Sequence, residues 1–121
     1  MLLLDLLSCL ALAAGDQVDP SELKIIYAGN PGSPREADFV SFLEEHFGEV
    51  QALPITEVTE AKVKDGDVVI FDWTSSYKEN KEYAGEYPQV QLGASFAKAS
   101  VLIGGMGATI GGGRGTKLDW L

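Results

Sequence analysis

The chain is short of positive charge. Nine Lys and Arg residues stand against 18 Asp and Glu residues, which gives a formal net charge of −9 at pH 7. Because such a surface repels phosphate groups, we expect neither nucleic acid nor an anionic membrane surface as a partner. The sequence also lacks an uncharged apolar run of the roughly 18 residues that a transmembrane helix needs, so we expect no stable membrane span. With 121 residues, 45% hydrophobic and 22% charged, the composition predicts one ordinary globular domain.

Residues 1–14 stand apart in composition, because half of them are leucine and Ala13 and Ala14 end the run. This pattern resembles a secretory signal peptide and predicts an extracytoplasmic chain, secreted or periplasmic, with residues 15–22 as a linker. Asp5 within the leucines and the absence of Lys and Arg before them are atypical of such a signal. Leu6-Leu7-Ser8-Cys9 also resembles a lipobox, which would anchor the chain through a lipid on Cys9. An amphipathic N-terminal helix packed on the domain is the remaining alternative.

The chain contains one cysteine and one histidine. Cleavage near Ala13 or Ala14 removes Cys9, and the remaining chain then has no disulfide, no cysteine nucleophile and no cysteine metal ligand. His46 lies near the end of a predicted helix without a recognisable catalytic partner, so we interpret it as structural. The sequence therefore predicts no catalytic residue, no metal site and no cofactor.

Four segments have the composition of β-strands, at residues 23–28, 49–55, 67–73 and 99–103. The last two are uninterrupted apolar runs, which predicts parallel strands buried on both faces, with 67–73 central. Between these strands, residues 56–66 are predicted to be a polar connection with a helical turn at 58–63. Residues 74–98 are predicted to be an irregular surface excursion.

One helix is well marked. Ser33 is a helix cap, Pro34 suits the first helical position, and Glu36 completes a capping box. Gly48 is placed to end the helix after Phe47. An apolar stripe is predicted to face the sheet, formed by Ala37, Phe39, Val40, Phe42, Leu43 and Phe47. Strands alternating with helices predict an α/β fold, a three-layer flavodoxin-like sandwich with a parallel sheet, over residues 23–121 and incomplete at its C-terminus.

The last predicted strand opens into a glycine-rich stretch, residues 104–115. Ile110 stands where a dinucleotide fingerprint requires its third glycine, and Gly115-Thr116-Lys117 has the wrong order for a phosphate-binding P-loop. The remaining functional interpretation is a pocket lined by backbone, because ligands of α/β sheets bind beyond the carboxyl ends of the strands. Its residues are Gly104, Gly105, Met106 and Gly107. The alternative is a tight turn followed by a flexible loop.

Two other segments are predicted to reach the same sheet edge. The loop at Gly29, Asn30 and Ser33 precedes the capped helix, where Ser33 and Arg35 would help to hold an anion. Asp72, Trp73 and Thr74 end the central strand and offer a carboxylate, an indole and a hydroxyl suited to a polar ligand such as a sugar. The alternatives are a capped helix without a ligand, and Asp72 as a turn former beside a packing Trp73.

The order of elements and the run Val101-Leu-Ile-Gly-Gly-Met-Gly-Ala-Thr109 resemble the class I glutamine amidotransferase-like superfamily, including its trehalose-utilisation-like secreted relatives. In that family a cysteine nucleophile sits on a tight elbow after the strand. On this chain the elbow covers residues 104–107, and Gly105 falls at the position of the cysteine. No histidine follows His46, so the resemblance implies a domain without glutaminase chemistry.

The resemblance therefore implies a non-catalytic extracytoplasmic domain that binds a small polar molecule or a partner protein at the carboxyl edge of the sheet. Two alternatives stay open. One is a hydrolase of the same superfamily whose catalytic residues lie beyond Leu121. The other is a flavodoxin-like cofactor binder.

Overall fold

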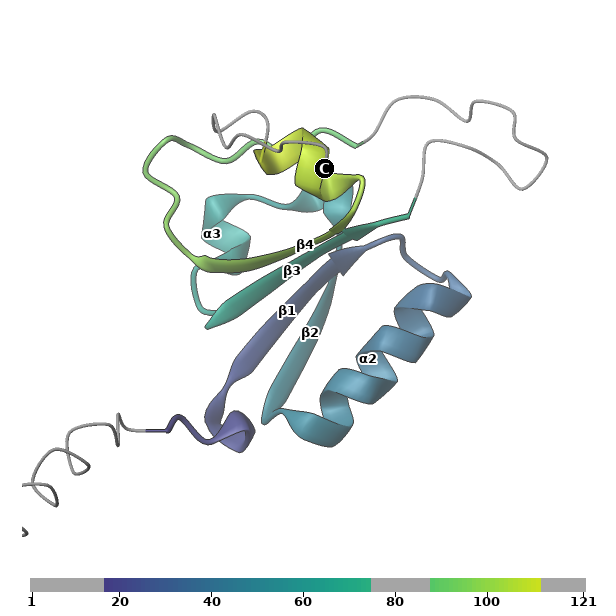
Figure 1. Ribbon diagram of the computed structural model, residues 1–121, viewed down its shortest axis with the longest axis vertical. Coiled ribbons are helices and arrows are strands. Elements are labelled where there is room, and N and C mark those ends of the chain that lie inside the picture. The colour runs from purple at the N-terminus through teal and green to yellow at the C-terminus, as the bar shows by residue number, and fades with distance from the viewer. Residues whose placement is uncertain (1–16, 75–87, 112–121) are drawn as a thin grey trace, which may run out of the picture.

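A computed structural model describes residues 17–74 and 88–111 of the chain. A four-stranded sheet has the order β2-β1-β3-β4, and each neighbouring pair is parallel. Its strands are β1 (Lys24–Gly29), β2 (Glu49–Pro54), β3 (Val68–Trp73) and β4 (Ala99–Gly104). Helix α2 (Pro34–His46) lies on one face, and α3 (Glu60–Val63) and the π-helical turn η3 (Gly107–Gly111) lie on the other (Figure 1). The predicted α/β class and flavodoxin-like arrangement are confirmed.

The two central strands, β1 and β3, are almost entirely buried. Successive side chains of a strand point to opposite faces. Ile25 and Tyr27 therefore pack on the α2 side with Leu43 and Ile70. The alternate residues of both strands pack on the opposite face, with α3 and the segment after β4. The prediction that residues 67–73 form a central parallel strand is confirmed.

The prediction that residues 99–103 are buried on both faces is wrong. Within the described residues β4 pairs only with β3, and Val101 is 46% exposed. Val101 and Ile103 are paired with Ile70 and Asp72 and share their face of the sheet. Helix α2 covers that face over β1 and β2, which leaves β4 outside its cover (Figure 1). An apolar run alone does not distinguish this arrangement from full burial.

Helix α2 has the predicted cap. The Ser33 hydroxyl accepts a hydrogen bond from the Glu36 N–H at 3.1 Å, and Pro34 occupies the first turn. The Glu36 carboxylate reaches one residue further back than a capping box requires, and accepts from the Gly32 N–H at 3.0 Å. The predicted stripe was too wide: Phe39, Val40, Leu43 and Phe47 pack on the sheet, but Ala37 and Phe42 are exposed. Phe42 instead lies against the ring of His46.

Gly48 follows the helix, and a close approach explains why this residue is glycine. A Cβ atom there would lie 1.9 Å from the Ser21 carbonyl oxygen. Ser21 belongs to the short 3-10 helix η1 (Pro20–Glu22), which Asp19 caps, so part of the predicted linker forms a helical turn beside Gly48. The backbone N–H of Ser21 lowers the pKa of Asp19 by a hydrogen bond to its carboxylate.

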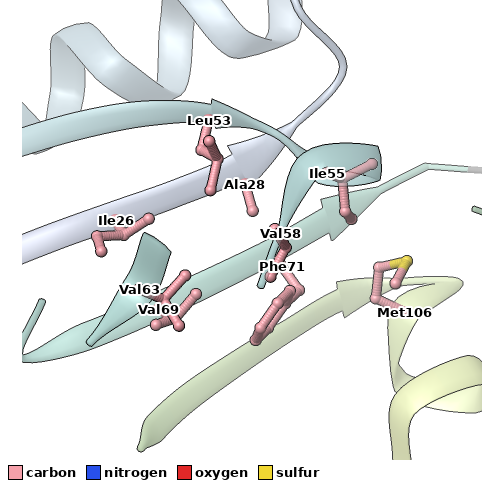
Figure 2. Packing of buried hydrophobic residues seen from close by; sticks show 9 residues of the cluster. All are labelled: Ile26, Ala28, Leu53, Ile55, Val58, Val63, Val69, Phe71 and Met106. Carbon is pink, nitrogen blue, oxygen red and sulfur yellow. The ribbon is translucent and has the colours of Figure 1, made fainter. Parts of the chain in front are cut away.

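The face opposite α2 holds the larger apolar cluster (Figure 2). Between β2 and β3 the chain forms η2 (Ile55–Glu57) and then α3, capped by Thr59, so a helical turn in this connection is confirmed. The described end of the predicted surface excursion, residues 88–98, is irregular and has no fully buried residue, but its partly buried side chains Val90, Leu92 and Phe96 pack on this cluster. Residues 75–87 lie outside the described residues. No helix of the described chain is long and apolar enough to cross a membrane.

Candidate functional site

A pocket of about 280 Å³ lies at the carboxyl edge of the sheet. The chain turns at residues 30–33 between β1 and α2, while β3 ends beside β1, so both segments meet at this edge. A crevice beyond the carboxyl ends of parallel strands is the usual ligand site of such folds. The pocket is lined by Tyr27, Asn30, Ser33, Pro34, Arg35, Asp72, Trp73 and Thr74.

Asp72 lies on β3 on the same face as Ile70 and is only 2% exposed. Its Oδ2 atom accepts hydrogen bonds from the Tyr27 hydroxyl at 2.5 Å and from Arg35 Nε at 2.7 Å. Its Oδ1 atom accepts from Arg35 Nη2 at 3.0 Å. A carboxylate is costly to bury unless it is paired and hydrogen-bonded. Tyr27 and Arg35 together meet that requirement.

Tyr27 is held in its neutral form. Burial raises the pKa of Tyr27, and the hydrogen bond to the Asp72 carboxylate raises this pKa further. Gly29 makes room for the ring, because a Cβ atom at Gly29 would lie 2.7 Å from the ring atom Cε1 of Tyr27. The phenol therefore remains a hydrogen-bond donor to Asp72 at neutral pH.

Arg35 is fixed on two sides. Its bidentate bond to Asp72 raises the pKa of the guanidinium, which stays charged. Its Cζ atom lies 5.0 Å from the centre of the Phe39 ring, and Phe39 stacks on Tyr27 at 5.5 Å between ring centres. The stack and the carboxylate define one position for the guanidinium, although 41% of the Arg35 side chain is exposed. We call Tyr27, Asp72 and Arg35 the buried-carboxylate cluster.

The polar side chains of the pocket that could transfer a proton are engaged by other groups of the protein. Both oxygens of Asp72 already accept hydrogen bonds from the protein. The Ser33 hydroxyl is engaged in the helix cap, since it accepts from the Glu36 N–H and donates to the Asn30 carbonyl. Within residues 17–74 and 88–111, no three His, Cys, Asp or Glu side chains are grouped closely enough to hold a metal ion.

The structure brings together five of the residues predicted from the sequence. Two separate segments place them in the pocket lining: Asn30, Ser33, Asp72, Trp73 and Thr74. Gly29 does not line the pocket but shapes it through Tyr27. Trp73 is partly buried and packs against the larger apolar cluster, as the packing alternative predicts, and it also lines the pocket.

Residues 104–111 of the glycine-rich stretch are not part of this pocket lining. Gly104 has a φ of +64°, and a Cβ atom there would lie 2.3 Å from the Trp73 carbonyl oxygen. The Gly105 N–H donates to that same oxygen at 2.9 Å. Met106 is fully buried in the apolar cluster, so its side chain is a core residue and is unavailable to a ligand (Figure 2). The glycines at 112–115 lie outside the described residues.

Sequence reasoning missed Tyr27 and gave Arg35 only a supporting role. Tyrosine is common in strands, so Tyr27 within the predicted strand at residues 23–28 gives no signal of a site. One signal was available: Asp72 interrupts an apolar strand, and a buried carboxylate needs partners. Arg35 is the one cation between β1 and the middle of α2, which made it the natural counter-ion.

His46 lies at the opposite end of α2 from the pocket and is exposed. Its Nδ1 atom is 2.7 Å from the Phe42 carbonyl oxygen, within the same helix. This placement agrees with a structural role for the side chain.

No family model, curated protein or solved structure matches this chain. Function is therefore inferred from the fold and from the geometry of the pocket.

Proposed function

We propose that this chain is a non-catalytic binding domain that takes up a small polar molecule in the pocket between β1, β3 and the start of α2. The buried-carboxylate cluster carries this proposal. It orders a charged side chain, Arg35, at a hollow of about 280 Å³. Burying Asp72 is costly, and replacing a buried ion pair by apolar side chains of similar volume is often neutral or stabilising.

The composition of the pocket supports a small ligand. Its volume lies just below the range of about 300–1,000 Å³ that is usual for small-molecule sites. Apolar surface comes from Pro34 and Trp73, and a few polar groups come from Asn30, Arg35 and Thr74. This mixture of an apolar wall and few polar groups is typical of sites that orient a small polar molecule.

The absence of catalysis is proposed from two features. The Asp72 carboxylate is occupied by its partners and is not free to act as a base. At the elbow of the amidotransferase-like family, both the strained position, Gly104, and the position aligned with the cysteine, Gly105, lack a side chain. We keep the amidotransferase-like relationship and the extracytoplasmic location as part of the proposal. The latter rests on residues 1–14, which lie outside the described residues.

The experiment uses two matched variants. Thr74→Phe places a large side chain at the mouth of the pocket, and Thr56→Phe makes the same change at an exposed residue of η2. Isotope-labelled protein is titrated with glucose, glycerol, acetate and flavin mononucleotide, and amide NMR shifts are followed. We expect at least one of the first three probes to give saturable shifts at Asn30 and Thr74. These shifts should be lost in Thr74→Phe and retained in Thr56→Phe.

Two results would contradict the proposal. One is that none of the probes shifts the pocket resonances. The other is that Thr74→Phe and Thr56→Phe respond alike, which would place binding elsewhere. Saturable binding of flavin mononucleotide alone would favour the flavodoxin-like alternative.

A further inference from the structure

We infer that the ligand of this pocket carries a carboxylate group, which the outward edge of the Arg35 guanidinium receives. The inference rests on the proposed function and specifies the chemical class of the ligand. Two observations support it: the hydrogen bonds of the buried-carboxylate cluster, and the Arg35 N–H donors that take no part in these bonds.

The guanidinium of Arg35 has a donor edge that the protein does not use. An arginine has five N–H donors in a planar fork. The Nε–H and one Nη2–H of Arg35 bind Asp72 side-on. Within residues 17–74 and 88–111, the structure gives no acceptor for the Nη1 atom or for the second hydrogen of Nη2. The Arg35 side chain is 41% exposed and lines the pocket, which leaves room for a ligand to approach these donors.

The fork is also oriented before any ligand arrives. Asp72 is buried and holds one edge, Tyr27 anchors Asp72 from behind, and Phe39 covers one face of the guanidinium. An arginine loses side-chain entropy when a ligand immobilises it, which weakens binding. Folding has already restricted the Arg35 side chain, so a ligand that binds its free edge loses less of this entropy and binds more tightly than it would to a mobile arginine.

The donor and acceptor balance of the pocket selects the ligand class. Asp72 is the one acidic residue of the described lining, and its buried carboxylate already accepts three hydrogen bonds from Tyr27 and Arg35, which leaves it poorly placed to bind a cationic ligand. The unused guanidinium edge presents parallel donors. Two parallel oxygens match such an edge best, and charge-assisted bonds of this kind are roughly twice as strong as neutral ones.

The net charge of −9 opposes an anionic ligand only at long range. Interactions between exposed charges are screened beyond about 8 Å at physiological ionic strength. Among the described residues of the pocket lining, Arg35 and Asp72 are the charged ones, and their charges offset each other. Short-range hydrogen bonding at the Arg35 edge therefore decides the preference.

The test compares acetate with acetamide, which has nearly the same shape but no charge. The chain has two tryptophans, so Trp120→Phe leaves Trp73 of the pocket lining as the one indole reporter. Titration of this protein is followed by tryptophan fluorescence at constant ionic strength. We expect saturable binding of acetate that is at least about tenfold tighter than binding of acetamide.

Three further variants locate the effect. Arg35→Lys keeps the charge but removes the fork, and we expect it to lose most of the preference for acetate. Arg35→Gln with Asp72→Asn removes both charges without leaving a buried carboxylate alone, and it should abolish the preference. Lys62→Gln removes one positive charge at an exposed site far from the fork, and it should bind acetate as the parent does.

The outcomes separate the two proposals. If acetamide binds as tightly as acetate, or if the double variant keeps the preference, the carboxylate inference fails while pocket binding stands. If acetate, acetamide, glucose and glycerol all leave Trp73 fluorescence and the pocket amide shifts unchanged, both proposals fail.

Discussion

The Arg35–Asp72 pair gives the most informative prediction about stability. We expect Arg35→Gln to lower the free energy of unfolding by about 3 kcal/mol, because removing one partner of a buried ion pair typically costs 3–5 kcal/mol. We take the lower end of that range because the Arg35 side chain is 41% exposed, so water replaces part of the lost contact. Tyr27 also continues to donate to Asp72. The measurement is urea denaturation at pH 7 followed by circular dichroism.

A double-mutant cycle isolates the contribution of the pair. Asp72→Asn in the Arg35→Gln background replaces the stranded carboxylate by an amide, and should recover about 2 kcal/mol of the loss. The matched control is the exposed pair of Lys62 and Glu57, whose N···O distance of 2.9 Å resembles that of the buried pair. Exposed pairs typically contribute 0.2–1 kcal/mol, so its cycle should give a coupling energy of about 0.5 kcal/mol. Equal coupling energies for the two pairs would refute the account of Asp72 as a buried charge dependent on Arg35.

Three further predictions follow from the same contacts. Because the pKa of folded Tyr27 is raised, its contribution to stability is complete below the unfolded tyrosine value of about 10 and is lost as the pH rises above it. The unfolding free energy of the parent should therefore fall more steeply in this alkaline range than that of Tyr27→Phe, and parallel curves would contradict the assignment. Gly104→Ala should lower the free energy of unfolding by about 2 kcal/mol or more, because Gly104 has a φ of +64° and its Cβ would meet the Trp73 carbonyl. The control is Gly107→Ala, which has open space at its Cβ position and should change this free energy by less than about 0.5 kcal/mol. Met106→Ala should cost about 2–5 kcal/mol in thermal or urea unfolding if the side chain fills the core, and an unchanged midpoint would place it outside the core.

The fold was largely accessible from the sequence. Each strand begins and ends within one residue of its prediction, because apolar β-branched runs are a local signal. The Ser33 cap is a local signal of the same kind for the start of α2. The exposure of β4 was not accessible, since it depends on which strands α2 covers. That choice is made by contacts between distant parts of the chain, and a run of apolar residues does not encode it.

The candidate site was accessible only in part. Topology placed Asn30 and Ser33 together with Asp72 and Thr74, because the carboxyl ends of parallel strands meet at one edge. The cluster that orders the pocket joins Tyr27 to Asp72 across 45 residues, and a single sequence shows no such pairing. One residue of the glycine-rich stretch is glycine for a structural reason. Gly104 has a positive φ, and its backbone packs closely on the Trp73 carbonyl, and both features require a glycine. A sequence does not distinguish such a glycine from one that makes room for a ligand.

The central claim is that the pocket at the end of β1 and β3 recognises its ligand through Arg35. The most direct measurement is the side-chain Nε–H resonance of Arg35 during an acetate titration of the labelled chain. We predict a saturable shift of this resonance, accompanied by amide shifts at Asn30 and Thr74, and no saturable shift around Lys62. Acetate shifts of equal size near Lys62 and Arg35, or no saturation at Arg35, would contradict the claim.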